Sequence, residues 1–278
     1  MAKIGIFDSG IGGLVVTKAI TKALPKYDYV YLGDTQRVPY GPRSAKVVQD
    51  FTREAVKYLF EKENCGLIIL ACNTASARAL RKMQKEFPSK KILGVLIPAA
   101  EDAAKFKKVG VIGTAGTVAS NSFPREIKKI NKYVKVFQNP APMLVPLAEA
   151  GERKAAIPFI KQYLAPFLYK SRRPKGSGPR PNASGKIEAL VLGCTHYPIF
   201  KREFELALRS LGVGGKIISQ DEIIPEKLKD YLKRHPEIEK KLTRNKNVKI
   251  LVTDKTKTIE KLTRDWFGKI KPKLISLS

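Results

Sequence analysis

The chain has 278 residues and is 43% hydrophobic, which is enough apolar material for two modest domains or one large one. Its net charge of +28 is spread from Lys3 to Lys273 without a basic block interleaved with aromatics, so we expect no specific nucleic-acid binding. There is no apolar run of about 18 residues and no signal-peptide pattern, so we expect a cytoplasmic protein without membrane insertion.

Short apolar segments alternate with helix-like segments along most of the chain. Amphipathic stretches such as Ser44–Lys62, Ala75–Phe87 and Ile199–Leu211 separate continuous apolar runs. This alternation is typical of parallel sheets covered by helices on both faces, and it predicts an α/β fold. The expected strands, in chain order, are Lys3–Phe7, Tyr29–Leu32, Leu67–Leu70, Ile92–Leu96, Lys108–Ile112, Val134–Phe137, Ala189–Leu192, Lys216–Ile218 and Lys249–Val252.

The two halves of the chain carry related segments. KIGIFDSGIGGLVV starts at Lys3 and KVGVIGTAGTVAS at Lys108, and a cysteine follows 69 residues after the first start and 86 after the second. The difference of 17 is close to the length of residues 171–185, a Pro-, Gly- and Arg-rich segment that we expect to be a flexible basic surface insertion. We therefore predict two similar α/β domains, each with one cysteine just past a strand.

The three cysteines differ in their surroundings. Their odd number, the lack of a Cys-x-x-Cys pair and the presence of only two histidines argue against disulfides and zinc. Cys72 and Cys194 follow apolar strands, where ligands of α/β sheets bind, and each is followed by polar residues. His196 stands close enough in sequence to tune Cys194. An ordinary buried cysteine is the alternative at Cys72, and Cys65 is best explained as structural.

Three polar loops follow other predicted strands. Asp8-Ser9-Gly10-Ile11-Gly12-Gly13 has glycines that permit a tight turn with exposed N–H groups, but it lacks the spacing of a nucleotide-binding loop. Asp34 begins a second polar loop that includes Pro39-Tyr40-Gly41, and Thr114 and Thr117 mirror the first loop in the other half. Ordinary turn chemistry is the alternative for all three.

Taken together, the motifs resemble the glutamate racemases of the aspartate/glutamate racemase family. They occur in family order across about 190 residues, and the CTHYP form is closer to glutamate than to aspartate racemases. The segments that carry the resemblance are DSGIGGL (Asp8–Leu14), GDTQRVPYG (Gly33–Gly41), ACNTASA (Ala71–Ala77), GTAGTVAS (Gly113–Ser120), PLAEAG (Pro146–Gly151) and LGCTHYP (Leu192–Pro198).

The resemblance implies a cofactor-independent racemase without a metal site. Cys72 and Cys194 would be the two proton donors and acceptors, one on each face of the substrate, and Asp8 and His196 would assist them. Residues expected to hold the amino acid, besides Asp8 and His196, are Ser9, Tyr40, Gly41, Asn73, Thr74 and Thr195. Residues expected to complete the cleft are Asp34, Thr114, Thr117 and Glu149.

The family fold implies two domains with the active site in the cleft between them. We expect residues 1–97 and 215–278 to form the first domain and residues 98–214 the second. The expected reaction is the interconversion of L- and D-glutamate for peptidoglycan, and a homodimer is left open. The alternatives are another amino-acid racemase of the family, such as an aspartate racemase, and a basic nucleic-acid-binding protein on a racemase fold.

Overall fold

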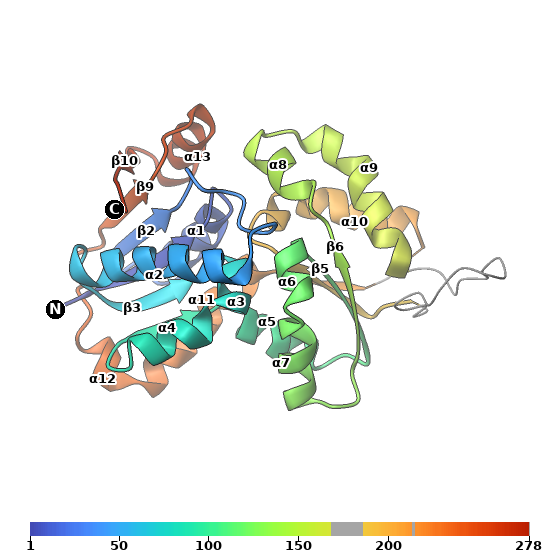
Figure 1. Cartoon of the computed structure of the whole chain (residues 1–278), viewed down its shortest axis with the longest axis horizontal. Helices are drawn as coiled ribbons and strands as arrows, with labels where there is room; N and C mark the ends of the chain where they lie inside the picture. The colour runs from blue at the N-terminus through green and yellow to red at the C-terminus, as the bar shows by residue number, and fades with distance from the viewer. Residues whose placement is uncertain (168–185, 213–214, 278) are drawn as a thin grey trace.

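The computed structural model describes residues 1–167, 186–212 and 215–277. Two parallel sheets, each flanked by helices, form two α/β domains that meet near the middle of the molecule (Figure 1). The predicted α/β class is confirmed. The insertion expected at residues 171–185 lies outside the described residues.

The first sheet has six parallel strands in the order β10-β9-β2-β1-β3-β4. Its central strands are continuous apolar runs because helices cover both of its faces. In chain order the strands are β1 (Lys3–Asp8), β2 (Tyr29–Gly33), β3 (Cys65–Leu70), β4 (Lys91–Gly94), β9 (Val248–Val252) and β10 (Lys273–Leu274).

The second sheet has four parallel strands in the order β6-β5-β7-β8. They are β5 (Lys108–Gly113), β6 (Lys135–Pro140), β7 (Ala189–Gly193) and β8 (Lys216–Ile218). The order β2-β1-β3-β4 in the first sheet is the same arrangement, so β1 corresponds to β5 and β3 to β7. Cys72 follows β3 and Cys194 follows β7, which confirms the predicted internal repeat.

The helices pack against the sheets in groups. One face of the first sheet is covered by α1, α11 and α13, and the other by α2, α3 and α4. In the second domain α8, α9 and α10 cover one face, while α5 and α7 cover the other. Their bounds are α1 Gly13–Ala23, α2 Ala45–Glu61, α3 Asn73–Arg78, α4 Leu80–Glu86, α5 Leu96–Ala103, α6 Ala115–Ala119, α7 Ser122–Ile130, α8 Leu144–Glu149, α9 Arg153–Leu164, α10 Lys201–Ser210, α11 Gln220–Arg234, α12 Pro236–Glu239 and α13 Lys257–Phe267, with 3-10 turns η1 Ala165–Phe167 and η2 Tyr197–Phe200.

Two predicted elements end differently in the structure. The helix expected over Ala75–Phe87 is two helices, because the backbone turns at Ala79 between α3 and α4. The strand expected to run to Leu96 stops at Gly94, and Leu96 begins α5. Pro98 favours this start, since proline fits the first turn of a helix but cannot donate to a sheet.

The domain boundaries also move by a few residues. The expected return to the first domain at 215 falls before β8, which pairs with β7 in the second sheet. We therefore propose that the chain returns to the first domain after Ile218. The other boundary, at 97/98, falls inside α5, whose buried residues pack with the second sheet.

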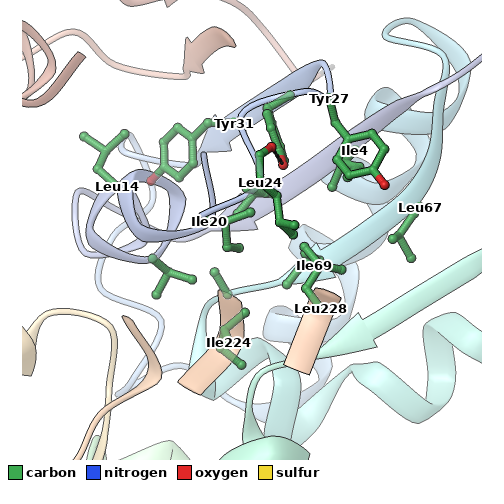
Figure 2. Close-up of a cluster of buried hydrophobic side chains, with 14 of the residues drawn as sticks. Ile4, Leu14, Ile20, Leu24, Tyr27, Tyr31, Leu67, Ile69, Ile224 and Leu228 are labelled. Atoms are coloured by element: carbon green, nitrogen blue, oxygen red, sulfur yellow. Dashed lines mark hydrogen bonds between the residues drawn. The ribbon is translucent and has the colours of Figure 1, made fainter. Parts of the chain in front are cut away.

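Each domain has its own apolar core. Figure 2 shows part of the first, where Ile4 of β1, Ile20 of α1 and Ile224 of α11 gather on one face of the sheet. Leu14 and Tyr31 extend the same cluster toward the carboxyl ends of the strands. Apolar clusters of this kind lie on both faces of both sheets and pack them against helices, which holds the strand ends in place. Among the described residues no helix is long and apolar enough to span a membrane.

Phe204 tests the core of the second domain. Its side chain on α10 is fully buried, whereas Leu206 on the same helix is 53% exposed. We expect Phe204→Ala to lower the free energy of unfolding by about 3–5 kcal/mol, because it removes buried apolar surface and leaves a cavity. Leu206→Ala is the control and should change it by less than about 0.5 kcal/mol. Chemical denaturation followed by circular dichroism measures both, and equal effects would contradict this assignment of the core.

Candidate active site

The site lies where the carboxyl ends of the two sheets face each other. Cys72 lies two residues after the end of β3 and is the N-cap of α3, and Cys194 directly follows β7. Both cysteines are buried, with 5% of each exposed. Each belongs to an apolar cluster of its own domain, but each also has a polar side chain beside its sulfur, Ser9 at Cys72 and His196 at Cys194.

Cys72 is held as a protonated thiol. Ser9 Oγ, on the loop after β1, lies 3.5 Å from Cys72 Sγ. Burial is the largest influence on this thiol and, with the nearby charge of Asp8, raises its pKa to about 12. The charge of Cys194 raises it further, so the two thiols interact electrostatically across one site.

Cys194 has a different partner. His196 Nδ1 lies 3.7 Å from Cys194 Sγ, and His196 Nε2 lies 2.6 Å from Glu149 Oε1. Burial alone would lower the pKa of His196, but the hydrogen bonds to Cys194 and Glu149 outweigh it and raise the pKa well above the ordinary histidine value. The raised pKa favours the cationic imidazole beside Cys194.

Asp8 joins the two domains. It is fully buried at the end of β1, where Gly10 N donates to Oδ1 at 2.9 Å. Thr195, from the second domain, donates its hydroxyl to Oδ2 at 3.0 Å. Burial raises the pKa of Asp8 to about 6, although the positive charge of His196 and both hydrogen bonds act in the opposite direction.

A threonine cluster makes the reciprocal contact. Thr74 Oγ1 of the first domain lies 2.8 Å from Thr114 Oγ1 and 3.4 Å from Thr117 Oγ1 of the second. Thr114 also caps α6, since its hydroxyl accepts from Thr117 N. Each domain thus supplies hydrogen-bonding partners to polar side chains that follow the strands of the other domain.

Asn73 offers an unused donor. Its Oδ1 accepts from Gln220 Nε2 at 2.9 Å, but Asn73 Nδ2 is buried without a hydrogen-bond partner among the described residues. An unpaired buried amide costs free energy unless a ligand satisfies it. Asn73 Nδ2 is therefore suited to a substrate carboxylate. Gln220 was not among the expected site residues, although it lies at the start of a helix after β8.

The loop after β2 borders the threonine cluster. Asp34 is fully buried, and its carboxylate accepts from Arg37, Tyr40 and Thr253. It therefore organises the loop from within the first domain. Gly41 lies against the second domain, where an added Cβ would come within 2.8 Å of Thr114 Cβ.

The structure brings the expected residues together, with different roles. Asp34 and Tyr40 bond to each other and shape the loop, whereas the others lie at the contact between the domains. Among the described residues, no group of three His, Cys, Asp or Glu side chains is arranged to hold a metal ion. The residues at this contact are Asp8, Ser9, Gly41, Cys72, Asn73, Thr74, Thr114, Thr117, Glu149, Cys194, Thr195 and His196.

This arrangement is suited to moving one proton onto a carbon and another off it. One thiol is protonated and the other has a cationic partner, so one can donate while the other accepts. Two such groups on separate domains can address opposite faces of a molecule held between them.

Comparison with known proteins gives the family. A glutamate racemase from Aquifex aeolicus is 36% identical over 280 residues, which cover 99% of this chain and 98% of that protein. The chain belongs to the glutamate racemase family. Its resemblance to that family, inferred above from six motifs, is thereby confirmed, and the chain is an isomerase of the racemase class. No model of a protein family matched the sequence.

Solved structures of glutamate racemases have the same two-domain fold. The enzyme from Francisella tularensis, in complex with D-glutamate, matches with a TM-score of 0.85 and 30% identity, over 100% of this chain and 98% of that one. An isoform from Bacillus anthracis matches with a TM-score of 0.83 and 32% identity, over 99% and 98%.

A substitution at Gly12 tests how closely the two domains must approach each other for activity. A Cβ at this position would lie 2.6 Å from His196 Nδ1 and 2.7 Å from Thr195 Oγ1. We expect Gly12→Ala to displace these residues and lower racemase kcat/KM by about 100-fold, the usual result of misplacing catalytic groups by about 1 Å. The matched control is Gly215→Ala, whose Cβ would make ordinary contacts of 3.4 Å or more. Full activity in Gly12→Ala would show that the site tolerates a wider separation.

Proposed function

We propose that this chain interconverts L- and D-glutamate by a two-base proton transfer between Cys72, the substrate and Cys194. The observation that carries the proposal is the placement of these cysteines at equivalent strand ends of two facing domains. Their partners differ, since Ser9 contacts Cys72 and His196 contacts Cys194. One thiol can therefore be protonated while the other is not.

In the proposed mechanism the α-carbon lies between the two sulfurs. The Cys194 thiolate, paired with His196, removes the α-proton, and the electron pair of the C–H bond is left on the α-carbon. Cys72 then delivers its own proton to the opposite face. Cys194 ends as a thiol and Cys72 as a thiolate, so the product state is the starting state for the reverse direction.

The neighbouring polar groups support this reaction by holding the substrate. The α-proton of an amino acid is weakly acidic, so its removal needs firm orientation and a site without bulk water. Asn73 Nδ2, which has no partner among the described residues, can donate to a carboxylate, and the charge of Asp8 stabilises the cation on His196. No cofactor enters this scheme.

In the cell, the proposed product is D-glutamate for peptidoglycan, made in the cytoplasm. The support is membership of the glutamate racemase family. The homodimer stays a prediction.

Cofactor-free turnover is the direct test. We expect the purified protein to racemise L-glutamate without additives and, in deuterated water, to leave deuterium at the α-carbon of the product. Cys72→Ala and Cys194→Ala should each lower kcat by at least about 1,000-fold, because a proton donor or acceptor on one face is lost. Cys65→Ala is the matched control, since it removes a buried cysteine outside the site.

Circular dichroism polarimetry with each amino acid in turn measures the racemisation. Turnover of aspartate but not glutamate would replace the proposed substrate. Full activity in either site-cysteine variant would exclude the two-base mechanism.

The pH dependence should reveal Asp8. Since burial raises the pKa of Asp8 to about 6, this carboxyl is ionised at neutral pH and takes up a proton as the pH falls through that value. We expect kcat/KM to fall with it, because the neutral acid no longer stabilises cationic His196. Asp8→Asn mimics the neutral form, so its activity should be low and should lack this acidic limb. An unchanged limb in that variant would assign the titration to another group.

A further inference from the structure

Arg78, the last residue of α3, contacts two segments outside its own helix. Its Nε donates to the backbone carbonyl of Gly116 at 3.0 Å, and its Nη1 donates to the backbone carbonyl of Arg43 at 2.5 Å. Gly116 lies on α6 of the second domain, and Arg43 follows the loop that carries Tyr40 and Gly41. One guanidinium therefore connects three segments that border the site.

Each of these segments carries expected site residues. The helix that ends in Arg78 starts directly after Cys72, and the first turn of α6 holds Thr114 and Thr117. The carbonyl of Arg78 itself accepts from Gln49 Nε2 at 3.0 Å, which fixes the end of α3 to α2. The side chain is thus anchored in the first domain and reaches across to the second.

The segments meet at backbone distance. A Cβ on Gly116 would lie 2.7 Å from the carbonyl oxygen of Gly41 and 3.1 Å from Arg78 Cζ. A side chain at position 116 would therefore press against the Gly41 carbonyl and crowd the guanidinium. Such a close contact makes the spacing between the two domains sensitive to what occupies this position.

Arginine is the side chain suited to this link. Its planar fork donates in two directions at once and stays protonated at any working pH, whereas lysine offers a single point of charge. Both acceptors are backbone carbonyls, so the link does not depend on the charge of a partner. The nearby pair between Arg81 and Glu126 also joins the domains, but Arg81 is 67% exposed and such pairs contribute little.

We propose that Arg78 is a positioning residue that holds the two domains together beside the site, through Gly116 of the second domain and Arg43 of the first, just after the Tyr40–Gly41 loop. It acts on Thr74, Thr114 and Thr117 indirectly, by fixing the helices that carry them. The effect on catalysis rests on the proposed function, but the effect on the contact between the domains does not.

Hydrogen–deuterium exchange of the free protein tests the contact without any reaction. In Arg78→Met we expect exchange to rise about tenfold in peptides covering residues 36–44 and 113–120, consistent with the loss of charge-assisted hydrogen bonds. Peptides from β1 and β5 should not change. Arg81→Met is the matched control, because it removes the same charge nearby and should leave both peptides unaffected. Equal exchange in the two variants would overturn the proposal.

Kinetics with glutamate tests the consequence for catalysis. We expect Arg78→Met and Arg78→Lys each to lower kcat/KM about tenfold, with Arg81→Met within twofold of the wild type. Low activity in Arg78→Lys would show that the two hydrogen bonds, and not the positive charge alone, are needed. A fully active Arg78→Lys would overturn the proposal. If Arg78→Met does not fold, exchange is measured on Arg78→Lys, which lacks the two-way hydrogen bonding and should give the same exchange pattern. A wild type inactive on glutamate would defeat the proposed function, while the exchange result would still decide the role of Arg78.

Discussion

The structure depends on one constraint, the close approach of two polar strand ends from separate domains. Across this contact, Asp8 of the first domain accepts a hydrogen bond from Thr195 of the second. Thr74 of the first domain is hydrogen-bonded to Thr114 of the second. Each of these groups is buried, and a buried hydroxyl or carboxylate without a partner costs free energy. Each domain satisfies only some of the polar groups at its own strand end, and the contact between the domains supplies the remaining hydrogen bonds. This close approach requires a glycine at position 12, because there is no space for a side chain between its backbone and His196.

Burial then sets the charges of the site. Removing water from Cys72 and Asp8 raises both pKa values, so the thiol stays protonated and the carboxyl titrates at about 6. The same desolvation would neutralise His196, but the hydrogen bonds to Glu149 and Cys194 reverse the effect. Keeping Asp8 ionised above that pH costs folding free energy, because the buried form prefers the proton. The rest of the two sheets has to supply this stability, and their fully buried apolar strands do so.

The fold and the place of the candidate site can be predicted from the sequence because both follow from local patterns. Apolar runs located nine strands, and the two cysteine motifs at strand ends located the site. The pairing of Thr74 with Thr114, or of Asn73 with Gln220, depends on how two domains dock, and no local pattern encodes that. The same reason applies to Arg78, which looks like a solvated helix residue until Gly116 is placed beside it. The two-residue strand β10 was missed because its residues are exposed and too few to show a period.

A near-symmetric backbone with asymmetric partners has a kinetic consequence for a racemase. The two enantiomers of glutamate have equal free energy in water, so kcat/KM must be the same in both directions whatever surrounds the sulfurs. The difference between Cys72, beside Ser9 and Asp8, and Cys194, beside His196 and Glu149, can therefore make kcat and KM each differ between the two directions, but not kcat/KM. Duplication of the domain supplies two thiols at equivalent positions. In the proposed mechanism, the unlike neighbours would decide which thiol holds the proton before substrate binds, and hence which enantiomer the protein converts first.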